Sequence, residues 1–107
     1  MNYHIVFSQA AKQQLGLLFD YIANAESPEL AGQFTSAIVN HCKLLQSFPH
    51  RGTMRDDVRP GLRITNYKKR VVIAFAVEEA EKTVFIIGLF YGGQNYEAVL
   101  YEGFEDQ

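Results

Sequence analysis

Apolar and polar residues alternate with two different periods along this chain, a helical period in the first half and a strand period in the second. Residues 3–7 alternate with period two, which predicts a short strand. Ser8 follows, a residue type that caps helix N-termini, and the apolar positions after it recur at helical spacing. This first helical stripe consists of Ala11, Leu15, Leu18 and Ile22.

The first predicted helix has a wide apolar face. Leu17, Phe19 and Tyr21 flank the stripe and widen it to about half of the helix circumference, whereas a surface helix carries a stripe of ~100°. A helix of this kind is buried on two sides or binds a partner.

A second helix is predicted to follow after a short connection. Ser27, Pro28 and Glu29 provide an N-cap, a proline in the first turn and an acid near the positive end of the helix dipole. The helix should end near Ser47, because the residue before Pro49 avoids the helical conformation. Two helices joined by a short connection predict an antiparallel hairpin. The apolar face of the second helix consists of Leu30, Phe34, Ile38 and Leu45.

The second half of the chain predicts three strands, at residues 62–67, 70–77 and 83–91, with a turn at Lys68–Lys69. The last strand is apolar on both faces, which is typical of a central strand, so residues 3–7 are expected to pair with it. The pattern predicts a two-layer α+β fold with an N-terminal strand, a helix hairpin and a three-stranded antiparallel meander. The economical packing is one antiparallel sheet with both helices on one face.

Size and composition predict a single globular domain. The chain has 107 residues, of which 48% are hydrophobic, and residues 1–107 are expected to fold as one unit with a loosely held acidic tail at 102–107. The lone Cys42 cannot form an internal disulfide. No run approaches the roughly 18 apolar residues of a membrane span, and no signal-peptide pattern is evident. We therefore expect a cytoplasmic protein without membrane contact.

The net charge of −2 conceals a strongly basic segment. Residues 48–70 carry seven basic residues against two acids, whereas residues 78–107 carry seven acids against Lys82. A basic segment on a small rigid scaffold indicates an anionic partner, either nucleic acid or an acidic protein surface. The alternative interpretation is a solvated linker.

No cofactor or metal site is expected, because the His and Cys residues show no metal-ligand spacing and no carboxylate cluster joins them. His41 and Cys42 fall on or beside the apolar face of the second helix. His41 is therefore expected to be a partly buried structural histidine, and Cys42 a small core residue.

Several segments, taken in order and at their spacings, resemble the ParE/RelE superfamily of toxins from bacterial toxin–antitoxin modules, and its ParE branch in particular. The resemblance covers nearly the whole chain and implies the fold derived above. The segments are the opening YHIVFSQAAKQQL, the helix start SPELAGQF, the helix end LLQSFPHRG, the GLR at residues 61–63, Tyr67, and the final FYGGQNYEAVL.

The resemblance implies two alternative activities. ParE-type members poison DNA gyrase, whereas RelE-type members are ribosome-dependent mRNA endoribonucleases that use basic residues on the sheet and a C-terminal Arg, His or Tyr. In both, a cognate antitoxin encoded beside the toxin silences it, in modules that stabilise plasmids. The implied partners are an antitoxin and either DNA gyrase or the ribosome with its mRNA.

The segment after the last strand argues against the ribonuclease. The family commonly has His-Gly-Arg-Arg-Asp there, and this chain has Tyr91-Gly92-Gly93-Gln94-Asn95. The missing His and Arg residues are the groups best suited to stabilise a pentacoordinate phosphate or protonate a leaving oxygen. The favoured prediction is a non-enzymatic toxin that binds a protein target. A metal-independent endoribonuclease and a non-toxic relic that binds only its antitoxin are the alternatives.

Two binding surfaces are predicted. Target recognition is expected in the basic segment, with Arg63 held rigidly on a strand and Arg55 held less firmly in a loop bounded by Pro and Gly. The antitoxin is expected on the flank of the first helix and on an exposed strand edge at 62–67, which could accept an added strand. The target-binding candidates are Arg51, Arg59, Arg63, Tyr67, Arg70 and Tyr96, and the antitoxin-binding candidates are Leu17, Tyr21, Leu62 and Ile64.

Overall fold

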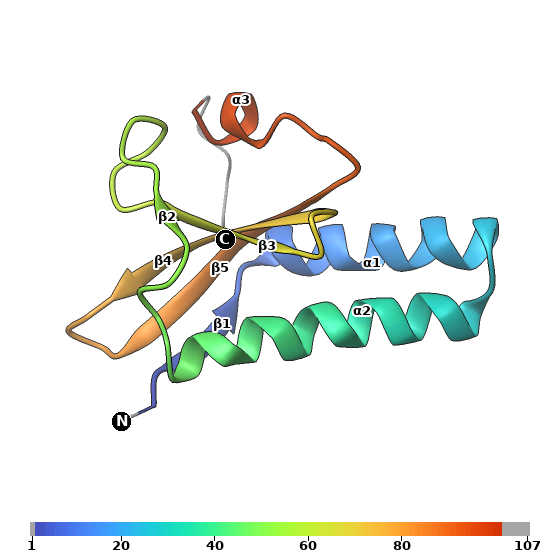
Figure 1. Cartoon of the computed structure of the whole chain (residues 1–107), viewed down its shortest axis with the longest axis horizontal. Helices are drawn as coiled ribbons and strands as arrows, with labels where there is room; N and C mark the ends of the chain where they lie inside the picture. Colours follow the sequence, from blue (N-terminus) through green and yellow to red (C-terminus); the bar gives the residue numbers. More distant parts are fainter. Residues whose placement is uncertain (1, 102–107) are drawn as a thin grey trace.

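The computed structural model describes residues 2–101 and shows a five-stranded sheet with a helix hairpin on one face (Figure 1). The α+β fold predicted from the sequence is confirmed. In chain order the elements are β1 (His4–Phe7), α1 (Gln9–Ala25), α2 (Pro28–Lys43), a 3₁₀ helix (Leu44–Gln46), β2 (Thr53–Met54), β3 (Arg63–Tyr67), β4 (Val71–Glu78), β5 (Thr83–Tyr91) and α3 (Tyr96–Tyr101).

Both long helices begin at the predicted caps. The Ser8 side chain accepts a hydrogen bond from the backbone N–H of Ala11, and the Ser27 side chain accepts one from Leu30. These serines satisfy backbone donors that the first turn of a helix leaves without a partner. The regular α-helix of α2 ends at Lys43, and the 3₁₀ helix carries the chain on towards the predicted end at Ser47.

The strand order is β1-β5-β4-β3-β2. The meander of β3, β4 and β5 is antiparallel, and β1 pairs with β5, both as predicted. The expectation of a wholly antiparallel sheet is wrong, because β1 runs parallel to β5. A tight turn forces β4 and β5 to run in opposite directions. The helices and three strands lie between β1 and β5 in sequence, so no short connection imposes a reversal on that pair.

A bulge in β5 changes which of its apolar side chains face the helices. The register with β4 shifts between Ala74 and Phe75, so Ile86 and Leu89 both face the helices while Ile87 faces the other side. Helix α1 satisfies backbone groups of this irregular stretch. The Ser8 hydroxyl donates to the Ile87 carbonyl at 2.8 Å, and the Gln14 side-chain oxygen accepts from the Leu89 N–H at 2.7 Å.

Each face of the sheet carries its own apolar core. The hairpin buries one face against residues such as Ile38, Ile73 and Phe75, which are fully buried. Helix α3 lies on the opposite side of the sheet (Figure 1) and places Leu100 against Leu62. The expected acidic tail at 102–107 lies outside the described residues. None of the helices within residues 2–101 combines the length and hydropathy required to cross a membrane.

Candidate functional site

The helix hairpin extends beyond the sheet at the end where α1 connects to α2 (Figure 1). Between this end and the turn that joins β3 to β4 lies a groove of about 460 Å³, which we call the hairpin groove. Its walls come from the two helices of the hairpin and from two parts of the sheet that follow them much later in the sequence. The lining residues are Tyr21, Ile22, Ala25 and Glu26 of α1 and its C-cap, Leu30, Gln33, Phe34 and Ala37 of α2, Tyr67, Lys68 and Arg70 around the β3–β4 turn, and Tyr91 of β5.

A row of aromatic rings runs along the hairpin groove. Tyr91 lies between Tyr21 and Phe34, with ring centroids 6.2 and 6.1 Å away. Phe34 in turn contacts Tyr67 at 5.7 Å, and Tyr67 contacts His41 at 5.3 Å. Most of these contacts are edge-to-face, a geometry that the charge distribution of aromatic rings favours. The row ties α1 and α2 to β3 and β5 and forms a firm apolar wall.

The β3–β4 turn places three consecutive cations beside this wall. Lys68 and Lys69 both have positive φ angles, 51° and 59°, in a turn where Asn-Gly is the favoured pair. A side chain held in this region costs about 1 kcal/mol or more per residue. Lys68, Lys69 and Arg70 are exposed, and none of them forms an ion pair within residues 2–101. The Lys68 ammonium lies 5.5 Å from the centre of the Tyr67 ring.

The flank of α1 beside the hairpin groove is apolar and exposed. Leu17 and Tyr21 are 69% and 62% exposed, whereas Leu18 on the same helix is buried. A second hollow of about 350 Å³ lies between this flank and the end of β5, and Tyr21 and Tyr91 line both hollows. The structure thus brings two predicted antitoxin-binding residues, Leu17 and Tyr21, close to two predicted target-binding residues, Tyr67 and Arg70.

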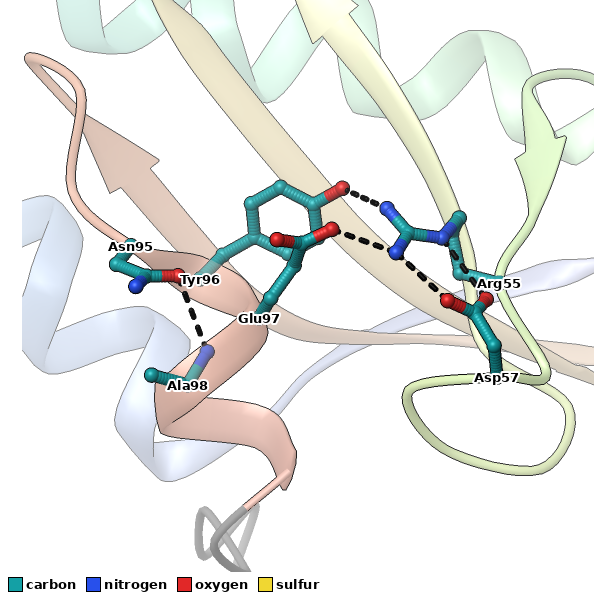
Figure 2. A network of polar contacts seen from close by, with 6 residues as sticks. All are labelled: Arg55, Asp57, Asn95, Tyr96, Glu97 and Ala98. Atoms are coloured by element: carbon teal, nitrogen blue, oxygen red, sulfur yellow. Dashed lines mark hydrogen bonds and ion pairs between the residues drawn. The ribbon is translucent and has the colours of Figure 1, made fainter.

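Arg55 organises a separate polar network on the α3 side of the sheet (Figure 2). Its guanidinium donates to the two oxygens of Asp57 at 2.9 and 2.8 Å and to the Tyr96 hydroxyl at 2.6 Å, and it pairs with Glu97 at 2.5 Å. The hydrogen bond to Asp57, and then that to Glu97, raise the pKa of Arg55, and Arg55 in return lowers the pKa of Asp57. The expectation that Arg55 is held less firmly than Arg63 is wrong, because this network fixes Arg55 on three sides.

Arg63 supports the backbone of a neighbouring loop. One of its guanidinium nitrogens donates to the carbonyl oxygen of His50 at 2.7 Å and to that of Arg51 at 3.4 Å. The six predicted target-binding residues therefore do not form one surface. Tyr67 and Arg70 line the hairpin groove, Tyr96 belongs to the Arg55 network, Arg63 holds the loop that carries the exposed Arg51, and Arg59 is partly buried.

The prediction of an open strand edge at residues 62–67 is wrong for the first half of that segment. The Leu62 side chain is 0% exposed, and β2 pairs with Arg63 and Ile64. This pairing depends on Gly52, whose φ is +84° and where a Cβ atom would lie 2.3 Å from the Ile64 carbonyl oxygen. Leu62 is therefore not available as a side-chain contact for a partner, and Ile64 is partly buried.

The remaining candidate groups have structural roles. Burial, followed by the nearby charge of Arg51, lowers the pKa of His41, whose ring packs on Tyr67. Cys42 is fully buried, and burial raises the pKa of its thiol to about 12, which excludes a reactive thiolate at neutral pH. No group of His, Cys, Asp and Glu side chains in residues 2–101 is arranged to hold a metal ion.

A family model for the ParE toxin of the type II toxin–antitoxin system parDE matches residues 5–96 of the chain. The chain belongs to the ParE toxin family. The match runs from β1 to the first residue of α3, so it includes the hairpin groove and all its lining residues. A comparison with curated protein sequences found no match.

Solved structures share the fold of this ParE-family member. A chain from the chromosomal ParDE system of P. aeruginosa is 22% identical, with a TM-score of 0.72 over 83% of this chain and 95% of that one. The toxin–antitoxin complex RelBE2 of Mycobacterium tuberculosis gives 15% identity and a TM-score of 0.65 over 88% and 95% of the two chains. A mutant of E. coli toxin RelE in the free state gives 13% identity and a TM-score of 0.61 over 95% of this chain and 96% of that one.

The sequence pattern did not reveal two features of the site. Helical spacing places Leu30 and Phe34 on the apolar face of the second helix, but it does not show that both line the hairpin groove, where Leu30 is 47% exposed and Phe34 also packs against the core. The pairing of Arg55 with Glu97 joins residues 42 positions apart, and no local pattern indicates it. The sequence signal for the site was the wide apolar arc of α1, because an arc wider than one buried face indicates that part of the helix contacts something else.

Proposed function

We propose that this chain is the toxin of a two-protein module, that it acts by binding a protein target, DNA gyrase, and that a cognate antitoxin neutralises it. The observation that carries the proposal is the exposed apolar flank of α1, with Leu17 and Tyr21, beside the aromatic wall of the hairpin groove. Exposed apolar residues gathered next to a groove are typical of protein-binding surfaces. The gyrase target is supported by membership of the ParE family.

The polar groups at the end of β5 favour binding over RNA cleavage. Cleavage without a metal requires an available cation for the phosphate and groups that exchange protons. Arg55, the cation beside α3, is already engaged by two carboxylates, whereas Lys68, Lys69 and Arg70, which form no ion pair within residues 2–101, stand at the β3–β4 turn beside the aromatic wall of the hairpin groove. Gln94 and Asn95 accept hydrogen bonds from the backbone N–H groups of Tyr91 and Ala98.

Expression of the chain under an inducible promoter tests the target. We expect plasmid DNA to lose negative supercoiling after induction, while bulk mRNA remains intact over the same interval. Degradation of mRNA before any change in supercoiling would support the RelE-type endoribonuclease instead. Growth without either change would support a protein that only binds its antitoxin.

A further inference from the structure

We propose that the hairpin groove binds a peptide segment of the antitoxin in which a large apolar side chain lies next to an Asp or Glu residue. The inference rests on the proposed function, since it takes the partner to be the antitoxin. It goes further in two ways: it makes the hairpin groove, and not the α1 flank alone, a binding site for the antitoxin, and it states the chemistry of the segment that enters the groove.

The apolar half of the segment is required by the walls of the groove. Tyr21 and Leu30 are 62% and 47% exposed, so the surface is still largely open in the described chain. Phe34 and Tyr91 close the floor through their edge-to-face contact. The volume of about 460 Å³ lies within the range of about 300–1,000 Å³ typical of ligand pockets. A groove of this size accepts a few side chains.

The acidic half of the segment is required by the charges at the rim. Lys68, Lys69 and Arg70 stand together at the sheet end of the groove without an acidic partner in residues 2–101. Arginine presents a planar fork that matches a carboxylate, and the two lysines add charge around it. Glu26 lines the groove among the helical residues. The groove therefore has opposite charges in its two parts, which orients a bound segment with its acid towards the turn.

Nucleic acid fits this surface less well than an acidic peptide. Base stacking requires open aromatic faces, whereas Phe34, Tyr67 and Tyr91 pack edge-on against one another. The carboxylate of Glu26 would repel a phosphate backbone that followed the groove. The cations also occupy one turn and do not form the continuous basic track that a nucleic-acid backbone needs.

The backbone of the turn adds an independent observation. Lys68 and Lys69 occupy left-handed conformations that Asn and Gly adopt more easily. Backbone strain of this kind gathers at functional sites, where the side chain it carries is needed. Three non-glycine residues within 2–101 have a positive φ, namely Lys68, Lys69 and Lys82 of the β4–β5 turn, and two of them are cations on the rim of this apolar groove.

The experiment selects ligands for the groove from a random library of 12-residue peptides displayed on phage, with the full chain immobilised. The same peptides are tested on a groove variant, in which Lys68→Glu and Arg70→Glu are combined. A control variant with Lys12→Glu and Lys43→Glu changes the same number of charges on exposed parts of the hairpin outside the groove. Thermal unfolding of all three proteins confirms that they are folded before selection.

We expect peptides enriched on the unaltered chain to carry Asp or Glu within a few positions of Leu, Phe or Trp. Their affinity should fall about tenfold or more on the groove variant, remain within about twofold on the control variant, and weaken with added salt. Enrichment without acidic residues, failure to enrich any sequence, or equal affinity for the groove variant would overturn the proposal.

The antitoxin itself separates this inference from the proposed function. The product of the reading frame beside the toxin should bind the unaltered chain and bind the groove variant about tenfold or more weakly. Equal binding to both would refute the groove assignment and leave the proposed function standing. If no antitoxin binds the unaltered chain, the proposed function fails, and the peptide selection still decides the chemistry of the groove.

Discussion

At the scale of single residues, the charges of the basic segment have different roles although they look equivalent in sequence. Arg55 joins the loop after β2 to α3 through Tyr96 and Glu97. Arg63 donates to backbone carbonyls, so its charge supports a loop. Arg70 lines the hairpin groove without an ion pair among the described residues. The partner of each cation, rather than its position in the sequence, sets its role.

Arg55→Ala is expected to lower the melting temperature, because it leaves Glu97 and the Tyr96 hydroxyl without their shared donor. The decrease should be smaller than that of Leu100→Ala, which removes a buried side chain under α3 and costs about 2–5 kcal/mol. Arg55→Lys should recover only part of the loss, since an ammonium cannot reproduce the planar fork. Equal melting temperatures for the Lys variant and the unaltered chain would show that charge alone suffices.

At the scale of elements, α1 divides its apolar residues between the fold and a free surface. Leu18 is buried against the sheet, whereas Leu17 and Tyr21 are exposed beside the hairpin groove. The β3–β4 turn is a second element with a function beyond connection, because it carries two lysines with positive φ. The exposed apolar residues of α1 lower solubility, and the positive φ angles of the turn lower local stability. Both features lie beside the hairpin groove.

Leu17→Glu and Tyr21→Glu are expected to weaken antitoxin binding while the free energy of unfolding stays within about 0.5 kcal/mol, as for ordinary surface substitutions. Leu62→Ala provides the contrast, since Leu62 is fully buried and its truncation should cost about 2–5 kcal/mol. Titration calorimetry with the antitoxin and urea unfolding measure the two effects. Unchanged affinity in both Glu variants would place the antitoxin elsewhere.

Replacement of Lys68–Lys69 by Asn-Gly is expected to stabilise the fold by about 0.5–1 kcal/mol, because this pair suits a turn with two positive φ angles. The same change should weaken binding of acidic peptides to the hairpin groove, since it removes two cations. Urea unfolding and peptide binding are measured on the same preparation. A gain in stability with no loss of binding would show that the lysines do not contact the ligand.

At the scale of the whole molecule, carboxylates order loop segments at two separate places, one within the loop after β2 and one where the β4–β5 turn meets the segment before β1 and the loop before β2. Asp57 pairs with Arg55 near α3, and Glu79, in the β4–β5 turn, accepts a hydrogen bond from the Tyr3 hydroxyl at 2.7 Å and contacts His50. The hydrogen bond from Arg55 lowers the pKa of Asp57, and those from Tyr3 and then His50 lower the pKa of Glu79. The folded state therefore holds both groups ionised more firmly than the unfolded state does.

Stability is consequently expected to fall on acidification. A carboxyl group with a lower pKa in the folded state contributes its full stabilisation above its ordinary value, which is 3.8 for Asp57 and 4.5 for Glu79. That contribution is lost as the pH falls from about 4.5 through the depressed pKa values of the folded state. Urea unfolding between pH 3 and pH 7 measures the effect. Asp57→Asn combined with Glu79→Gln should flatten the curve, and an unchanged slope would exclude these two groups as its cause.

The sequence alone determined most of the fold, because the signals that define it are local. Hydrophobic period, serine caps and turn residues located both long helices, the meander and the neighbour of β1. It also indicated, through the wide apolar arc of α1 and the resemblance to ParE toxins, that one helix face was more than core. The periodic signals require only residues that are close in the chain, whereas the resemblance rests on the order and spacing of segments along nearly all of it.

Only the tertiary structure decided which residues meet. The aromatic row joins Tyr21, Phe34, Tyr67 and Tyr91 from four elements, and β2 covers part of an edge that the sequence left open. Such contacts depend on strand direction, on a bulge and on the close approach that Gly52 permits, and none of these leaves a periodic signal. Spacing along a chain specifies the face of an element, whereas the partner of that face is set by how the elements pack together.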